Sequence, residues 1–305
     1  RDQKFSIETV SADMCFLNAG TRTNDCLRKF VPGLGPSGPL ANAAPVPGGV
    51  APSPGGENHS ATGAALAFQL LARNEVDKAL AEFDKAILAQ PGLSIAYAGR
   101  GYGLALKGRH DSALNDLDRA IQLDARSVMA FTWRGFAFFG RGEFDRAIAA
   151  LDQAVVLDDK VADAYVYRGA AYQSKGDHDQ AMRDLDKALE LAPRHTMALG
   201  FRAVTWAAKN EFDKAIEDYS GVLAAKPVNI GILFRRGQAY EKIGNNQAAR
   251  NDYLAATALK ATTLPDVVAQ GMARQRLNGL DAPAGSPGSP AAGQACNKQR
   301  NQMCL

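Results

Sequence analysis

The sequence has little cysteine and histidine, and it lacks the spacings with which these residues build metal or catalytic sites. It contains four cysteines and four histidines in 305 residues, and neither a Cys-x-x-Cys nor a His-Glu-x-x-His motif occurs. It also lacks the run of about 18 apolar residues that a membrane-spanning helix needs. We therefore expect no metal, no cofactor, no membrane span and no enzymatic activity.

The sequence also lacks a large excess of charge of one sign. It has 35 basic and 32 acidic residues, a formal net charge of +3, and the two signs interleave along the middle of the chain. A nucleic-acid surface would need a basic patch or stripe. The hydrophobic fraction of 46% is enough for a substantial core. We therefore expect a globular protein that does not bind nucleic acid.

Cysteine is absent from the middle of the chain, and the four that occur are Cys15, Cys26, Cys296 and Cys304. An even number outside the core is typical of disulfides in an oxidising compartment. Short loops favour pairing Cys15 with Cys26 and Cys296 with Cys304, and free thiols remain the alternative. The sequence begins with Arg1 rather than methionine, which a removed secretory signal would explain. We expect a periplasmic or secreted protein, with a cytoplasmic one as the alternative.

Two segments have the composition of flexible linkers. Residues 31–59 and 281–295 are dominated by proline, glycine, alanine and serine, and such segments bury too little apolar surface to fold. The predicted organisation is a cysteine-bearing segment 1–30, a linker 31–59, a block of repeats 60–263, a capping helix 264–280 and a cysteine-bearing tail 281–305.

The block between the linkers repeats every 34 residues without a gap. Small residues recur at Ala79, Ala113, Ala147, Ala181, Ala215 and Ala249. Large apolar residues recur four positions later, at Phe83, Leu117, Leu151, Leu185, Tyr219 and Tyr253. A fixed period of this length, with small and large residues in register, predicts stacked pairs of helices.

This block resembles the tetratricopeptide repeat. The repeat that starts at Ala162 has Tyr165, Gly169, Tyr172, Gly176, Ala181, Ala188 and Pro193 at the places where the family pattern asks for aromatic, small, turn and proline residues. Six repeats begin at Ser60, Ser94, Val128, Ala162, Thr196 and Ile230. The resemblance implies an all-α, right-handed superhelical solenoid of helix-turn-helix repeats. The segment after the last repeat, with Val268, Met272 and Leu277 near helical spacing, predicts a helix that caps it.

The resemblance also implies that the first helix of each repeat lines a concave groove for a protein or peptide partner. The candidate groove residues are Tyr102, Leu106, Met129, Thr132, Phe136, Phe139, Asp163, Val166, Ala170 and Gln173. Among them we expect an exposed apolar cluster of Tyr102, Met129, Phe136, Phe139 and Val166, with Asp163 and Gln173 fixing the partner's register. Two alternatives remain: these side chains pack against adjacent helices, or residues 31–59 cover the groove.

A row of arginines stands where many members of the family have leucine: Arg100, Arg134, Arg168, Arg202 and Arg236. The candidate partners are Asp116, Asp184, Asp218 and Asp252, with Asp152 two residues beyond Ala150 in the one repeat that has alanine there. A partly buried arginine without an acid would cost about 3–5 kcal/mol. We therefore expect a structural ladder, with pairing within one repeat favoured, and arginines that bind acidic ligands are the alternative.

The predicted function is a scaffold or adaptor for a protein segment. Two other classes stay open: an envelope or redox protein whose cysteine-bearing ends carry the activity, and the interaction domain of an enzyme whose catalytic part precedes Arg1.

Overall fold

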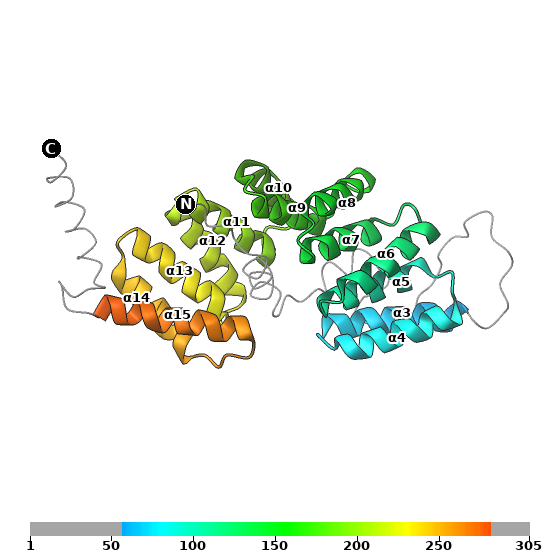
Figure 1. The fold of residues 1–305 in the computed structure, drawn as a ribbon, viewed down its shortest axis with the longest axis horizontal. Helices are drawn as coiled ribbons and strands as arrows, with labels where there is room; N and C mark the ends of the chain where they lie inside the picture. The colour runs from blue at the N-terminus through cyan, green and yellow to red at the C-terminus, as the bar shows by residue number, and fades with distance from the viewer. Residues whose placement is uncertain (1–56, 282–305) are drawn as a thin grey trace. The chain divides into compact units, whose positions relative to one another are not determined.

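The computed structural model describes residues 57–281, which form thirteen α-helices and no strand. The described residues divide into two compact units, 57–193 and 194–281. Each unit is a series of helices joined by short turns (Figure 1). The predicted all-α class and the tandem helix pairs are confirmed.

The first unit holds four helix pairs, each with its two helices packed against one another. First helices also contact the first helices of the next repeat, α5 with α7 and α7 with α9. In chain order the helices are α3 (Glu57–Ala72), α4 (Val76–Ala89), α5 (Ser94–Leu106), α6 (His110–Leu123), α7 (Val128–Gly140), α8 (Phe144–Leu157), α9 (Ala162–Ser174) and α10 (His178–Leu191).

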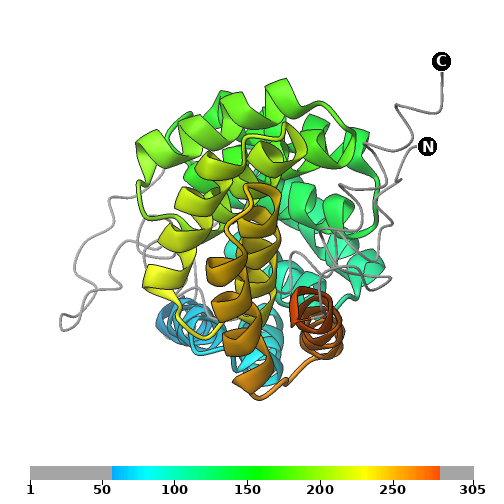
Figure 2. The ribbon, with the colours of Figure 1, turned by 90° about the vertical axis from the view of Figure 1, so that its left-hand side faces the viewer.

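The second unit holds two helix pairs and a single last helix. Its helices are α11 (Thr196–Ala208), α12 (Phe212–Ala225), α13 (Ile230–Lys242), α14 (Asn246–Ala258) and α15 (Leu264–Asp281). Helix α15, in the deepest orange of Figure 2, packs against both α13 and α14. It therefore lies against the last repeat, as a capping helix would.

The turn between the two helices of a repeat has the same backbone conformation in all six repeats, and the residue types at that place favour it. The residue after the C-cap of the first helix has a positive φ in all six repeats, from 61° to 85°. Glycine holds this place in four repeats and asparagine in the other two, the residue types that tolerate left-handed backbone. In the second repeat Gly108 donates to the carbonyl of Ala105 and Arg109 to that of Leu104, which makes a Schellman motif.

In four of the six repeats a large side chain of the second helix fills the space left by a glycine of the first helix. In the third repeat a methyl group on Gly135 would lie 2.4 Å from Cγ of Leu151. In the sixth repeat the same substitution on Gly237 would lie 2.5 Å from the Tyr253 ring. Leu151 and Tyr253 are fully buried. The missing side chain of glycine therefore sets how closely the two helices approach.

Two details differ from what the sequence pattern predicts. Helix α3 begins at Glu57, three residues before the first repeat that we expected to start at Ser60. In α15 the expected apolar face is only partly right: Leu277 is buried, but Val268 and Met272 are each 47% exposed. The buried face of α15 is made instead by small and amide residues, Ala269, Gln270 and Ala273.

We predict that Gly135→Ala destabilises the protein by about 1–3 kcal/mol, because overpacking a dense core forces side chains and backbone to shift. The free energy of unfolding by urea measures this. The same change at Gly169, where the nearest contact would be 3.0 Å, should cost less. Gly92→Ala is the control, because nothing lies within 4 Å of its added methyl group. Equal stability of the Gly135 and Gly92 variants would contradict the prediction.

Candidate functional site

Four of the five arginines in the row hold the aspartate 16 residues later with two parallel hydrogen bonds. In each pair Nε and Nη2 donate to the two carboxylate oxygens over 2.7–2.8 Å. The pairs are Arg100 with Asp116, Arg168 with Asp184, Arg202 with Asp218 and Arg236 with Asp252. All four aspartates are buried. This fork geometry suits arginine and is not available to lysine.

Arginines of the row also bond the preceding repeat through Nη1. The acceptors lie 16 residues earlier: Asp84 for Arg100 and Asp152 for Arg168, each over 2.7 Å, and the Ser220 hydroxyl for Arg236 over 3.0 Å. Arg168 on α9 thus joins α9 to both α10 and α8. Pairing is therefore not confined to one repeat, as we had favoured, but runs in both directions along the chain.

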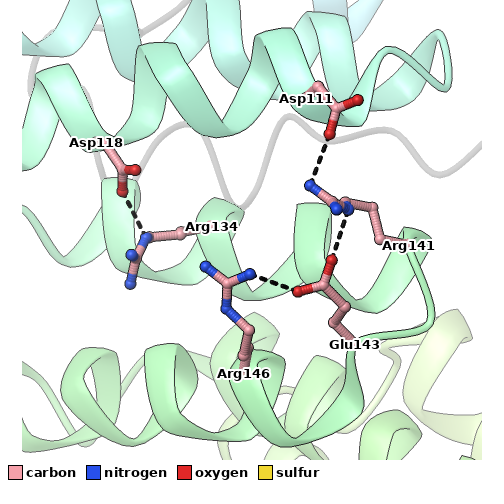
Figure 3. Close-up of polar contacts among 6 residues, drawn as sticks. All are labelled: Asp111, Asp118, Arg134, Arg141, Glu143 and Arg146. Atoms are coloured by element: carbon pink, nitrogen blue, oxygen red, sulfur yellow. Dashed lines mark hydrogen bonds and ion pairs between the residues drawn. The ribbon is translucent and has the colours of Figure 1, made fainter.

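The expectation that Asp152 serves its own repeat in place of Ala150 is wrong. A shift of two residues turns a side chain about 200° around a helix, so Asp152 faces the next repeat and bonds Arg168. Arg134, left without an acid in its own repeat, donates from Nε to Asp118 of the preceding repeat over 2.7 Å (Figure 3). Figure 3 also shows Arg146 of α8 reaching toward the same place as Arg134.

The environment keeps these arginines charged. Burial by itself lowers the pKa of the Arg168 guanidinium, but its hydrogen bonds and charge interactions with Asp184 and Asp152 outweigh burial and raise the pKa above its ordinary value. The hydrogen bond to Asp116 likewise raises the pKa of Arg100. Neither arginine loses its proton in the physiological range, so the ion pairs persist.

A second row of ion pairs, which the sequence reading missed, links the ends of three first helices, α5, α7 and α9, to the preceding repeat. The Arg141 guanidinium lies 2.6 Å from Asp111, and Lys107 with Asp77 and Lys175 with Asp145 pair in the same way. Each base caps the C-terminus of a first helix, and each acid lies in the first turn of a second helix, so both complement the helix dipoles. The only sequence signal is the period of 34 residues. The acids are more than 80% exposed, so each pair contributes about 1 kcal/mol or less.

The expected exposed apolar cluster of the groove is wrong, because the structure buries all five of its members. Tyr102, Met129, Phe136 and Phe139 are 3–7% exposed, and Val166 is fully buried. Thr132 and Ala170 are buried as well. The alternative, packing against adjacent helices, describes the aromatic members: the ring of Phe136 lies 5.7 Å from Tyr102, between centroids, and Phe139 lies 5.6 Å from Phe144.

The aromatic contacts continue through two residues that the sequence reading did not single out. Trp133 stacks on Tyr102 with centroids 4.8 Å apart, and Tyr167 lies 5.1 Å from Phe136. Phe68 on α3 contacts Trp133 at 5.9 Å. Trp133 and Tyr167 occupy the same place in consecutive repeats, one residue before the arginine, which is the signal that could have found them. The rings form a continuous row over α3, α5, α7 and α9.

Three of the predicted groove residues are partly accessible. Leu106 ends α5, while Asp163 and Gln173 lie on α9, and all three side chains are half-buried. They are the candidate groove residues whose side chains are partly exposed.

Other expectations fall partly outside the described residues. Cys15, Cys26, Cys296 and Cys304 lie outside residues 57–281, as do most of the linker and the proposed covering of the groove by residues 31–59. Within residues 57–281 no group of three or more metal-ligating side chains comes together. No helix in that range is both long and apolar enough to cross a membrane.

Comparisons with known proteins identify the repeats by sequence. Family models described as tetratricopeptide repeat match residues 162–195 and 208–263, and one described as TPR repeat matches residues 135–176. No curated protein matches the sequence at a significant level.

Solved structures match the fold at low sequence identity. The Cut9-Hcn1 hetero-tetramer of APC/C matches with a TM-score of 0.65 and 16% identity, over 71% of this chain and 43% of that chain. PilW, a type IV pilus biogenesis factor, matches with a TM-score of 0.59 and 18% sequence identity, over 68% of this chain and 97% of that chain. The pilF protein of Pseudomonas aeruginosa matches with a TM-score of 0.58 and 16% sequence identity, over 72% of this chain and 99% of that chain. These likenesses show the fold alone.

We predict that Arg168→Leu lowers the free energy of unfolding by about 3–5 kcal/mol, because it leaves the buried Asp184 without its charge partner. Urea denaturation measures the change. Replacing both residues, Arg168→Leu with Asp184→Leu, should recover part of the loss. Lys175→Leu is the control, because its pair with Asp145 is exposed and should cost about 1 kcal/mol or less. If Arg168→Leu left the stability unchanged and abolished the binding of a partner, the arginine would bind a ligand rather than hold the fold.

Proposed function

The chain belongs to the tetratricopeptide-repeat family, and on that premise we propose that it is a non-catalytic scaffold that binds a protein or peptide segment along the first helices of its repeats. The location of the binding surface is part of the proposal. The proposed surface combines the row of buried aromatic rings with partly exposed side chains on the same helices.

The observation that carries this proposal is the partial exposure of Leu106, Asp163 and Gln173 on helices that also carry the buried rings. Their helices, α5 and α9, both contact α7, so the three first helices lie next to one another. An apolar, an acidic and an amide side chain suit a segment with an apolar anchor and a basic or amide group, held in one register. The buried rings would act by fixing the backbone of α5, α7 and α9 rather than by touching the partner.

A selection of displayed random peptides against the intact chain tests this proposal. Selected peptides, measured by fluorescence anisotropy, should bind at least tenfold more weakly to Leu106→Glu and to Asp163→Lys than to the unchanged protein. Each variant places a new charge on the proposed surface, which a matched partner segment cannot accommodate.

Leu88→Glu is the control for this experiment. Leu88 is 84% exposed on α4, a second helix, so the variant adds the same charge outside the proposed surface. Its circular dichroism and peptide affinity should equal those of the unchanged protein. Failure to select any peptide, or equal losses in the Leu88 and Leu106 variants, would refute binding along the first helices.

An exported location, periplasmic or secreted, is also part of our proposal, since it rests on the four cysteines at the ends of the sequence. One of the matching structures, PilW, is described as a type IV pilus biogenesis factor, which is compatible with such a location. Thiol titration of the protein purified from its native source, unfolded without reductant, should find no reactive thiol. Four reactive thiols would refute the disulfides and remove the support for export.

A further inference from the structure

In one repeat the arginine of the row lacks the aspartate that pairs with it in the other repeats. The position that holds a buried aspartate in the repeats of Arg100, Arg168, Arg202 and Arg236 is Ala150 in the repeat of Arg134. Arg134 therefore has one bond, from Nε to Asp118, instead of the usual fork. Among residues 57–281 the structure gives neither of its Nη groups a hydrogen-bond partner.

The guanidinium of Arg134 is held at the surface by an aromatic ring. Its carbon Cζ lies 5.1 Å from the centre of the Phe138 ring, and the ring itself is buried. Arg146 from α8 stacks on the same ring at 4.1 Å and bonds Glu143 through Nη1 over 2.6 Å. Figure 3 shows the ends of the two arginines side by side. The side chain of Arg134 is 28% exposed and that of Arg146 59% exposed, so an external ligand can reach both.

We propose that Arg134 and Arg146 form a binding site for a carboxylate from an acidic side chain of a protein partner. The two Nη groups of Arg134 can donate two parallel hydrogen bonds to one carboxylate from the end of the guanidinium, whereas the other arginines of the row use Nε with Nη2. Arg146 adds a second positive charge over the same Phe138 ring. Phe138 fixes both side chains, so little conformational freedom is lost when the carboxylate binds.

The charge around the site selects a carboxylate over a phosphate. The six residues of Figure 3 are three arginines, Arg134, Arg141 and Arg146, and three acids, Asp111, Asp118 and Glu143, so their formal charges cancel, +3 with −3. A singly charged carboxylate needs one open fork, which Arg134 provides. A doubly charged phosphate would meet the repulsion of Asp118 and Glu143 without a further free cation. The site uses none of Leu106, Asp163 and Gln173, and the proposal does not depend on the proposed groove.

The test uses a fluorescein-labelled hexaglutamate peptide and the full chain, with fluorescence anisotropy at low and rising salt. The unchanged protein should bind the peptide, and added salt should weaken the binding. Ala150→Asp should weaken it at least tenfold, because the new aspartate takes the place of its counterparts in the other repeats and occupies the fork. Since Ala150 is 2% exposed and aspartate is larger, Arg146→Ala, at an exposed position, serves as a second variant and should weaken binding at least threefold.

Val156→Asp is the matched control for Ala150→Asp. It adds the same charge to the same helix, α8, at a side chain that is 79% exposed, and six residues along the helix it points away from Ala150. It should leave the affinity within twofold of the unchanged protein. Equal losses for Ala150→Asp and Val156→Asp would reduce the effect to general repulsion and overturn the site, as would the absence of binding at low salt.

A competition experiment distinguishes the two anions. Acetate, a singly charged carboxylate, should displace the labelled peptide at lower concentration than inorganic phosphate does. The reverse order would overturn the assignment of a carboxylate. Neither arm uses a peptide selected on the groove, so a failure here leaves the proposed scaffold function standing, and a failure of the groove variants leaves this site standing.

Discussion

The structure depends on a bidentate ion pair that lies directly beside a tight packing contact. In the fourth repeat Arg168 precedes Gly169 on α9, and Asp184 precedes Leu185 on α10. Leucine enters the notch left by glycine, and the arginine fork closes on the aspartate next to it. A small residue at this place, glycine here and Ala203 in the fifth repeat, lets the second helix come close enough for the short aspartate to reach both donors. Packing and charge pairing therefore fix the same helix distance and support each other.

The same arginine also connects its helix pair to the preceding helix pair. Arg168 bonds Asp152 on α8 as well as Asp184 on α10, so the position of the pair α9–α10 is tied to the preceding pair through one planar group. Proteins built from repeats owe their stability to terms within each repeat and terms between neighbours. In this chain one side chain serves both terms. Loss of a single arginine should therefore weaken two contacts at once, whereas loss of an exposed pair such as Lys175 with Asp145 affects only one.

The sequence alone was sufficient for the fold and for the partners of Arg100, Arg168, Arg202 and Arg236 within their own repeats, because both follow from a strict period of 34 residues. Asp184 could be assigned to Arg168 since both columns recur together. The bond from Arg168 to Asp152 could not be assigned, because an acid at that place looks like any other surface charge. The burial of Phe136 and Val166 could not be predicted either. Exposure depends on which neighbouring side chains cover a residue, and a periodic pattern states only which helix face it occupies.

The repeat with Ala150 shows how such an array can acquire a special site without losing its fold. Its packing contact, Gly135 with Leu151, is retained, and Arg134 keeps one bond to the preceding repeat through Asp118. The interlock between the two helices therefore survives the loss of the acid, and the unused part of the guanidinium becomes available at the surface. Because the printed bonds of each arginine in the row reach only its own and the preceding repeat, the remaining arginines keep their forks. A single change from aspartate to alanine can thus turn a structural arginine into a candidate for binding while the helices on either side stay in place.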